Sequence, residues 1–142
     1  MKKGSLKQYI HFNEVLSRLD DMALPDFDLV VGIAEGGKVP AALIAAKLRC
    51  SLKIIKISFR DSSNTPMFDI PRVISDIEQQ EIKGRTLLLV DDVCVTGKTI
   101  DRAKSLLSGA KIKTFVMKGR ADYVLFPEIQ ICVNWPWNVN PF

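Results

Sequence analysis

Apolar residues along the chain fall into short continuous runs and into segments with helical spacing. Continuous runs of this length predict strands that are buried on both faces. These strands are expected at 27–33, 52–59, 86–90 and 112–118. Helices are expected after an N-cap at Asn13 up to Pro25, at 39–48, and from about 97 to 108, closed by Gly109.

Strand–turn–helix units repeat along the chain, which predicts an α/β fold with a parallel sheet covered by helices. Ligands in such sheets bind at the carboxyl ends of the strands. Two loops suit that position, "AEGGK" after the strand at 27–33 and "DDVCVTGKT" after the strand at 86–90. The stretch 60–72 is polar, contains two prolines and reads as a long loop. Residues 73–77 are compatible with a short strand, and the tail at 119–142 holds further short strand-like pieces.

Composition narrows the picture to one ordinary globular domain spanning 1–142. The chain has 142 residues, 47% of them hydrophobic and 25% charged, and it has no apolar run long enough for a membrane span. Its three widely spaced cysteines predict reduced thiols, and its start lacks a signal peptide, so we expect a cytoplasmic location. The net charge of +4 is spread without a basic tract, which disfavours nucleic acid as a partner.

The segment "LLLVDDVCVTGKTI" combines two acids with a Gly-Lys-Thr sequence. A nucleotide-hydrolase P-loop requires Gly-x-x-x-x-Gly-Lys-Ser/Thr, and Asp92 stands where its first glycine would be. The P-loop interpretation therefore fails.

The arrangement that remains suits a different phosphate ligand. Loop amides at a helix N-terminus, with the hydroxyls of Thr96 and Thr99, form a cradle for a monophosphate. Asp91 and Asp92, one loop away, can accept hydrogen bonds from two vicinal hydroxyls. A phosphate at one end and a diol at the other describe a ribose 5-phosphate.

At this point the residues carry a resemblance. "LLLVDDVCVTGKT" resembles the signature of the type I phosphoribosyltransferases, which bind phosphoribosyl pyrophosphate (PRPP). Residues 11–45 are similar to the first half of small purine enzymes of the xanthine/guanine and hypoxanthine types. The resemblance implies a central, mostly parallel sheet flanked by helices, with a small base-binding hood from about 1–12 and 119–142. It also implies Mg²⁺ as cofactor, PRPP and a nucleobase as ligands, and a homodimer or homotetramer.

The resemblance assigns site residues position by position. The acids Asp91 and Asp92 would be catalytic and hold the ribose hydroxyls, with Asp92 also at the metal. The 5-phosphate would be bound by Val95, Thr96, Gly97, Lys98 and Thr99. The pyrophosphate would be bound by Glu35, Gly36, Gly37, Lys38 and Arg72, with Arg60 as a rival of Arg72. The base would be bound by Lys118, Val133 and Trp137.

Three positions depart from the family pattern. Glu35 stands where a basic or small residue is usual, and Val95 where many 6-oxopurine enzymes have an aspartate. Cys132 replaces an aromatic residue that stacks on the base, a role left to Trp135 or Trp137. The expected function is phosphoribosyl transfer from PRPP to a nucleobase, a 6-oxopurine in the first place, as in purine salvage. The alternative is a PRPP-binding regulatory protein with the same fold and little or no turnover.

Overall fold

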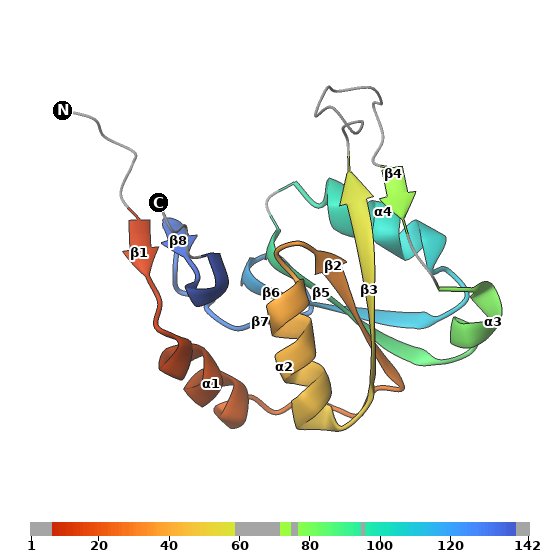
Figure 1. Cartoon of the computed structure of the whole chain (residues 1–142), viewed down its shortest axis with the longest axis horizontal. Helices are drawn as coiled ribbons and strands as arrows, with labels where there is room; N and C mark the ends of the chain where they lie inside the picture. The colour runs from red at the N-terminus through yellow and green to blue at the C-terminus, as the bar shows by residue number, and fades with distance from the viewer. Residues whose placement is uncertain (1–6, 59–71, 75–76, 95, 139–142) are drawn as a thin grey trace.

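The computed structural model describes residues 7–58, 72–74, 77–94 and 96–138. A six-stranded sheet forms its centre, in the order β4-β3-β2-β5-β6-β7, and β4 alone runs antiparallel to its neighbour (Figure 1). The strands are β2 (Leu29–Ala34), β3 (Ser51–Ser58), β4 (Arg72–Ile74), β5 (Thr86–Cys94), β6 (Lys111–Gly119) and β7 (Tyr123–Val124). The expected mostly parallel α/β sheet is confirmed.

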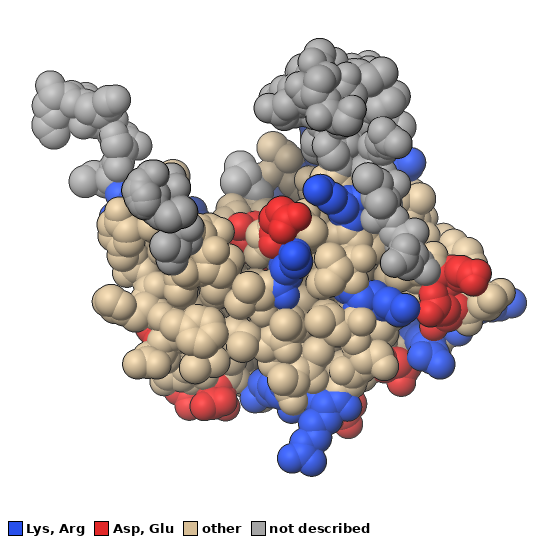
Figure 2. All heavy atoms as spheres, viewed as in Figure 1, with Lys and Arg blue, Asp and Glu red and all other residues tan. Residues whose placement is uncertain are grey.

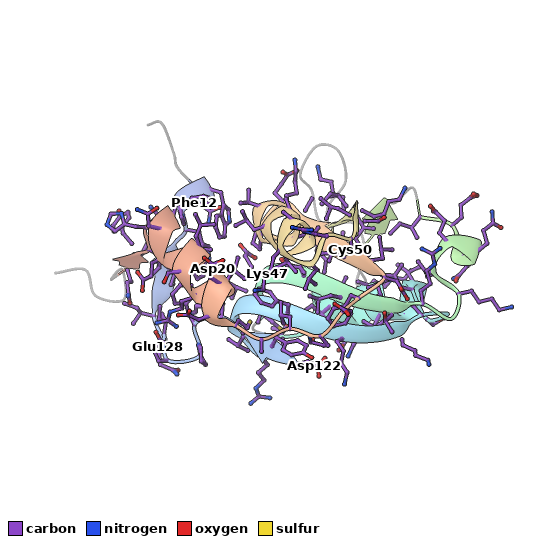
Figure 3. All side chains as sticks on the ribbon, turned by 90° about the horizontal axis from the view of Figure 1, so that it is seen from below. Phe12, Asp20, Lys47, Cys50, Asp122 and Glu128 are labelled. Carbon is purple, nitrogen blue, oxygen red and sulfur yellow. The ribbon has the colours of Figure 1, made fainter. Side chains whose placement is uncertain are left out.

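Helices cover both faces of this sheet. They are α1 (Phe12–Asp21), α2 (Lys38–Leu48), the short α3 (Gln79–Ile82) and α4 (Lys98–Leu106). Buried residues of α1 and α2 share one core cluster, and those of α3 and α4 share the other. Figure 3 shows α1 and α2 together on the same side of the sheet.

The central strand β5 explains why its sequence is continuously apolar. Leu88 and Val90 belong to the core on the α1 and α2 side, and Leu87 and Leu89 to the core on the α3 and α4 side. All four side chains are fully buried. Successive residues of a strand point to opposite faces, so a strand covered on both faces needs apolar residues at every position.

A second, two-stranded sheet joins the two ends of the described chain. Strand β1 (Lys7–Tyr9) pairs in parallel with β8 (Cys132–Asn134), which is followed by a 3₁₀ turn at Pro136–Asn138. Figure 1 shows this pair beside α1, at one end of the central sheet. The two paired strands belong to the two segments, about 1–12 and 119–142, from which the resemblance implies a hood.

A row of aromatic side chains anchors the tail to α1. Trp135 is 1% exposed, stacks on Trp137 with ring centroids 5.8 Å apart, and lies 5.6 Å from Phe126. The guanidinium of Arg18 sits 4.1 Å above the Phe126 ring and donates hydrogen bonds to the Leu125 carbonyl and the Glu128 carboxylate. Cation–π and charge-assisted contacts of this kind hold α1 against the tail.

Several element boundaries differ from the sequence expectations. The expected loop after residue 90 is wrong at its start: β5 continues through both acids to Cys94, because β6 pairs with it as far as Gly119. The first helix begins at Phe12 with His11 in the N-cap position, and Asn13 lies inside it. The cause is the preceding segment, which stays extended up to His11 while Ile10 donates a backbone hydrogen bond to Asn134.

The remaining differences are small. The helix expected at 97–108 spans Lys98–Leu106, and the strand expected within 73–77 is Arg72–Ile74. The sequence did not predict α3 or β1. None of the described helices has the length and apolar character needed to cross a membrane.

Truncation of Trp135 should test the anchoring of the tail. We expect Trp135→Ala to lower the free energy of unfolding by about 3–5 kcal/mol, because the indole is buried among apolar neighbours and its removal leaves a cavity. Urea unfolding followed by circular dichroism measures the loss. Tyr9→Ala is the matched control, since this ring is 69% exposed and its loss should cost no more than about 0.5 kcal/mol. Equal losses of the free energy of unfolding in Trp135→Ala and Tyr9→Ala would contradict the role of Trp135 as the anchor of the tail.

Candidate active site

The candidate site lies where the carboxyl ends of two neighbouring strands meet. β2 and β5 pair in parallel from Leu29 opposite Leu87 to Gly32 opposite Val90. The turn after β2 and the acids near the end of β5 therefore reach the same edge of the sheet. This edge is where ligands bind in open parallel sheets.

The turn after β2 lies directly against β5. The Ala34–Glu35 peptide bond is cis, and the amide of Gly37 donates to the Ile33 carbonyl over 2.7 Å. A Cβ atom at Gly37 would overlap the carbonyl oxygens of Val90 and Ile33, and one at Gly36 would overlap the carboxylate of Asp92. Glycine at both positions is what allows the turn backbone to come this close to the acids.

Asp91 and Asp92 form an acid pair in the last part of β5. The Asp92 amide donates to Asp91 Oδ1 over 2.8 Å, and the Val93 amide donates to Asp92 Oδ1 over 2.8 Å. Burial and, second, the charge of the neighbouring Asp92 raise the pKa of the Asp91 carboxyl to about 8. The ligand-free acid pair therefore resists carrying two negative charges at neutral pH.

The start of α4 provides backbone donors beside the acid pair. Gly97 has a φ of 85°, and Thr96 Oγ1 accepts a hydrogen bond from the Lys98 amide over 3.3 Å. The first amides of a helix lack acceptors within the helix, so this end favours an anion. Val95, which the resemblance assigns to the 5-phosphate, lies outside the described residues.

One cavity connects these two groups. It has a volume of about 310 Å³. Its lining consists of Asp91, Val93, Cys94, Thr96, Gly97, Thr99 and Ile100. An acid of the pair and the helix start thus face the same space, which is the arrangement expected for a ligand that carries both hydroxyl and phosphate groups.

A second cavity of about 320 Å³ shares Cys94, Thr96, Gly97 and Ile100 with the first and extends to the turn between β6 and β7. There the Thr114 amide and hydroxyl donate to Asp122 Oδ2 over 2.8 and 3.0 Å, which fixes this carboxylate (labelled in Figure 3). Sequence reasoning missed this cavity because its lining combines α4 with a turn that follows α4 only after the whole of β6.

The residues expected to bind the base come from β6 and the tail. Lys118 is half-buried and lies opposite Val93 in the β5–β6 pairing. Val93, Val133 and Trp137 all pack, partly buried, against the apolar cluster that contains Trp135. Cys132 is exposed, whereas the indole N–H of Trp137 is buried and has no hydrogen-bond partner among the described residues.

The expected pyrophosphate residues are only partly brought together. Glu35 is exposed and pairs with Lys38 at 3.6 Å and with Lys56 at 3.9 Å. Arg72 lies in β4, opposite Ser58 of β3, and its side chain is outside the described part of the structure. Sequence reasoning did not single out Lys56, because its place beside the glycine turn depends on the pairing of β3 with β2.

Comparison with known proteins adds independent information. The model of the phosphoribosyl transferase domain family matches residues 5–139. The chain is 31% identical over 120 residues to a xanthine-guanine phosphoribosyltransferase of Chromohalobacter salexigens, covering 81% of this chain and 71% of that protein. It is 27% identical over 118 residues to an orotate phosphoribosyltransferase of Sulfurisphaera tokodaii, covering 80% and 55%.

A solved structure resembles the whole fold. The purine phosphoribosyltransferase from Pyrococcus horikoshii superimposes with a TM-score of 0.80 at 25% identity, covering 96% of this chain and 97% of that one. The chain spans about half the length of the orotate phosphoribosyltransferases that it matches.

The raised pKa of Asp91 predicts a dependence of stability on pH. In the unfolded chain this carboxyl ionises near pH 4, whereas in the folded chain it ionises only near pH 8. Between these pH values the unfolded state is favoured by ionisation, so the free energy of unfolding falls as the pH rises. Asp91→Asn removes that penalty. We expect the variant to be more stable than the wild type by at least about 1 kcal/mol at pH 8, with the gap nearly closed at pH 4. Urea unfolding in a chelator at both pH values measures it, and a variant less stable than wild type at pH 8 would contradict the assigned burial.

Proposed function

The chain belongs to the phosphoribosyl transferase domain family, and from this premise we propose that it transfers a phosphoribosyl group from PRPP to a nucleobase, with release of pyrophosphate. The observation that carries the proposal is the cavity lined both by Asp91 and by the start of α4. PRPP presents a 5-phosphate and a ribose diol at opposite ends of one sugar, and this cavity offers a partner for each.

The sugar end of PRPP would be held by the acid pair and the helix start. Asp91 and Asp92 would accept hydrogen bonds from the ribose hydroxyls, while the backbone amides at 95–99 and the hydroxyls of Thr96 and Thr99 would bind the 5-phosphate. The pyrophosphate would lie along Gly36 and Gly37. The Gly37 amide already donates to the Ile33 carbonyl, so the proposed donor in this turn is the Gly36 amide.

The residues present fit Mg²⁺ as the cofactor. Mg²⁺ in phosphate-handling sites is bound by one or two carboxylates and by oxygens of the substrate rather than by an all-protein cage. The described residues contain no cluster of three or more acidic, histidine or cysteine ligands that could form such a cage. The acid pair instead suits a site in which one or two carboxylates share the metal with substrate oxygens, and Asp92 is the proposed ligand. When bound, Mg²⁺ would neutralise charge on the pyrophosphate leaving group.

The reaction requires no covalent intermediate with the protein. In a dissociative transition state, positive charge develops on the sugar ring oxygen and the anomeric carbon. The chain would contribute positioning of PRPP and the base and electrostatic stabilisation of separated charge. Valine at position 95 cannot exchange a proton with the base, so the base would react in an already ionised form or with its leaving proton taken by water.

For the base, we propose a 6-oxopurine. Lys118 lies at the end of β6 next to Val93, so its ammonium group can donate to an exocyclic oxygen of a base lying over the Val93 side chain. Val133 on β8 and Trp137 would close the other side of the base, as parts of a hood formed by about 1–12 and 119–142. The relatives include orotate as well as purine enzymes, so a base panel is the necessary test.

We also propose that the protein acts in the cytoplasm as a homodimer or homotetramer, with no nucleic acid as partner. A second candidate function, a PRPP-binding regulator with little turnover, is favoured by one observation: Glu35 neutralises lysines beside the glycine turn. Calorimetric titration of PRPP beside a turnover assay separates the two functions. Tight binding of PRPP without product for any base would favour the regulator.

The assay for the proposed reaction offers hypoxanthine, guanine, xanthine, adenine, uracil and orotate with PRPP and Mg²⁺, and measures pyrophosphate. In this assay we expect Asp92→Asn to lower kcat/KM by about 10²-fold, because the ribose and the metal lose a charged partner. Asp20→Asn, an exposed position of α1 remote from the sheet edge, is the control and should retain wild-type turnover. Turnover near wild type in Asp92→Asn would contradict the proposed role of the acid pair in binding the ribose and the metal.

Lys118→Met should affect the base and spare PRPP. We expect KM for the preferred 6-oxopurine to rise about 10-fold or more, because a charged hydrogen bond to its oxygen is lost, while the Kd for PRPP stays within about two-fold. Lys113→Met removes an exposed lysine from the same strand and serves as the control. A rise in the Kd for PRPP with an unchanged KM for the base would show that Lys118 serves the other substrate.

A further inference from the structure

Glu35 holds two lysines at the glycine turn. Its carboxylate lies 3.6 Å from the ammonium group of Lys38 and 3.9 Å from that of Lys56. All three side chains are half or more exposed, at 71%, 51% and 56% for Glu35, Lys38 and Lys56. Lys38 is expected to bind pyrophosphate from the resemblance, but Lys56 has no role so far.

The fold, not the sequence order, brings Lys56 to this turn. β3 pairs in parallel with β2, and Lys56 lies opposite Ala34, the last residue before the turn. Two residues earlier on the same strand, the Ile54 side chain lies near the position that a Cβ atom of Gly32 would occupy, and the Ala41 side chain of α2 lies near the same position. Because alternate residues of a strand share a face, Lys56 lies on the side of the sheet where α2 begins.

The surface above this point carries both signs of charge. In Figure 2, acidic and basic side chains meet in the region where Figure 1 draws the ends of β2 and β3 and the start of α2. Lys38 comes from the first turn of α2, whose amides also favour an anion. Two strands and one helix thus converge on one small charged area.

We propose that Lys56 binds the pyrophosphate group of PRPP and that Glu35 is an internal counter-ion which this group displaces. The inference rests on the proposed function, since it adds a residue and a competitor to the same site. In the ligand-free protein the Glu35 carboxylate keeps both lysines at the turn. When PRPP binds, the lysines exchange this carboxylate for phosphate oxygens.

The exchange is favoured by charge and costs little. A carboxylate brings one negative charge, whereas a pyrophosphate group brings about three and more acceptor oxygens, so it attracts the lysines more strongly. Ion pairs between exposed side chains contribute little to stability and are easily broken. Glu35 also repels the bound anion, so it lowers the affinity for PRPP and for the pyrophosphate product alike.

Calorimetric titration of magnesium pyrophosphate, and separately of PRPP, tests this inference without any base. We expect Lys56→Met to weaken pyrophosphate binding about 5- to 20-fold and Glu35→Gln to tighten it about 2- to 5-fold. In the double variant Glu35→Gln/Lys56→Met, the gain from Glu35→Gln should shrink, because part of it acts by freeing Lys56. Lys53→Met is the matched control: it lies on the same strand, is 40% exposed and pairs at 3.6 Å with Glu81 of α3. Being three residues from Lys56, it points to the opposite face of the sheet.

Each outcome decides a different point. Wild-type affinity in Lys56→Met, or an equal loss in Lys53→Met, would overturn the role of Lys56, and weaker binding in Glu35→Gln would overturn that of Glu35. A wild-type protein that binds neither pyrophosphate nor PRPP would end both this inference and the proposed function. A protein that binds pyrophosphate and PRPP but transfers the phosphoribosyl group to no base would contradict the proposed function. The Kd values of its variants would still test the roles of Lys56 and Glu35.

Discussion

The contact between the glycine turn and the end of β5 is the constraint on which the site depends. Asp92 lies where a Cβ atom of Gly36 would be, and the Val90 carbonyl where a Cβ atom of Gly37 would be. The turn can approach the acids this closely only because both positions lack side chains. In return, the glycine turn and the acid pair are fixed relative to one another by the hydrogen bonds of a buried sheet, which is the rigid support that the proposed sugar ligand would need.

The same close approach creates an electrostatic problem. Two adjacent carboxylates at the end of a strand are partly removed from water, and Asp91 responds by keeping its proton. A sugar with two hydroxyls, accompanied by a divalent cation, supplies donors and positive charge at that point. Without a ligand, the doubly ionised form of the acid pair is disfavoured. Part of the binding free energy of PRPP and metal would therefore be used to ionise Asp91. At the glycine turn the situation is reversed: the negative charge of Glu35 pairs with Lys38 and Lys56, and we propose that it does so until the ligand phosphates replace it.

Local sequence signals accounted for most of the central sheet and drew attention to the candidate site residues within each loop. The strands expected at 27–33, 52–59, 86–90 and 112–118 follow from apolar runs and correspond to β2, β3, β5 and β6, and the acids and the Gly-Lys-Thr of α4 stand out by their spacing. What the sequence left open depends on pairing between distant segments. β5 extends past residue 90 because β6 continues beside it, β1 exists because β8 pairs with it, and Lys56 faces Glu35 because β3 lies next to β2. No local propensity encodes such neighbours.

The tail shows how packing narrows the roles left to single residues. Cys132 removes the aromatic ring that the family resemblance places over the base, and two tryptophans follow as candidates to replace it. Trp135 is excluded as a ring that stacks on the base, because it is 1% exposed and packs between Phe126 and Trp137. Trp137 already stacks one face on Trp135, which leaves for a ligand at most its other face and its indole N–H, a donor with no partner within the described part of the chain. With stacking thus restricted, the proposed recognition of a base would rely on the edge of the base, through the ammonium group of Lys118 and the backbone of Val133, and on the aliphatic surface of Val93. A site of this kind selects by hydrogen-bond pattern more than by ring area.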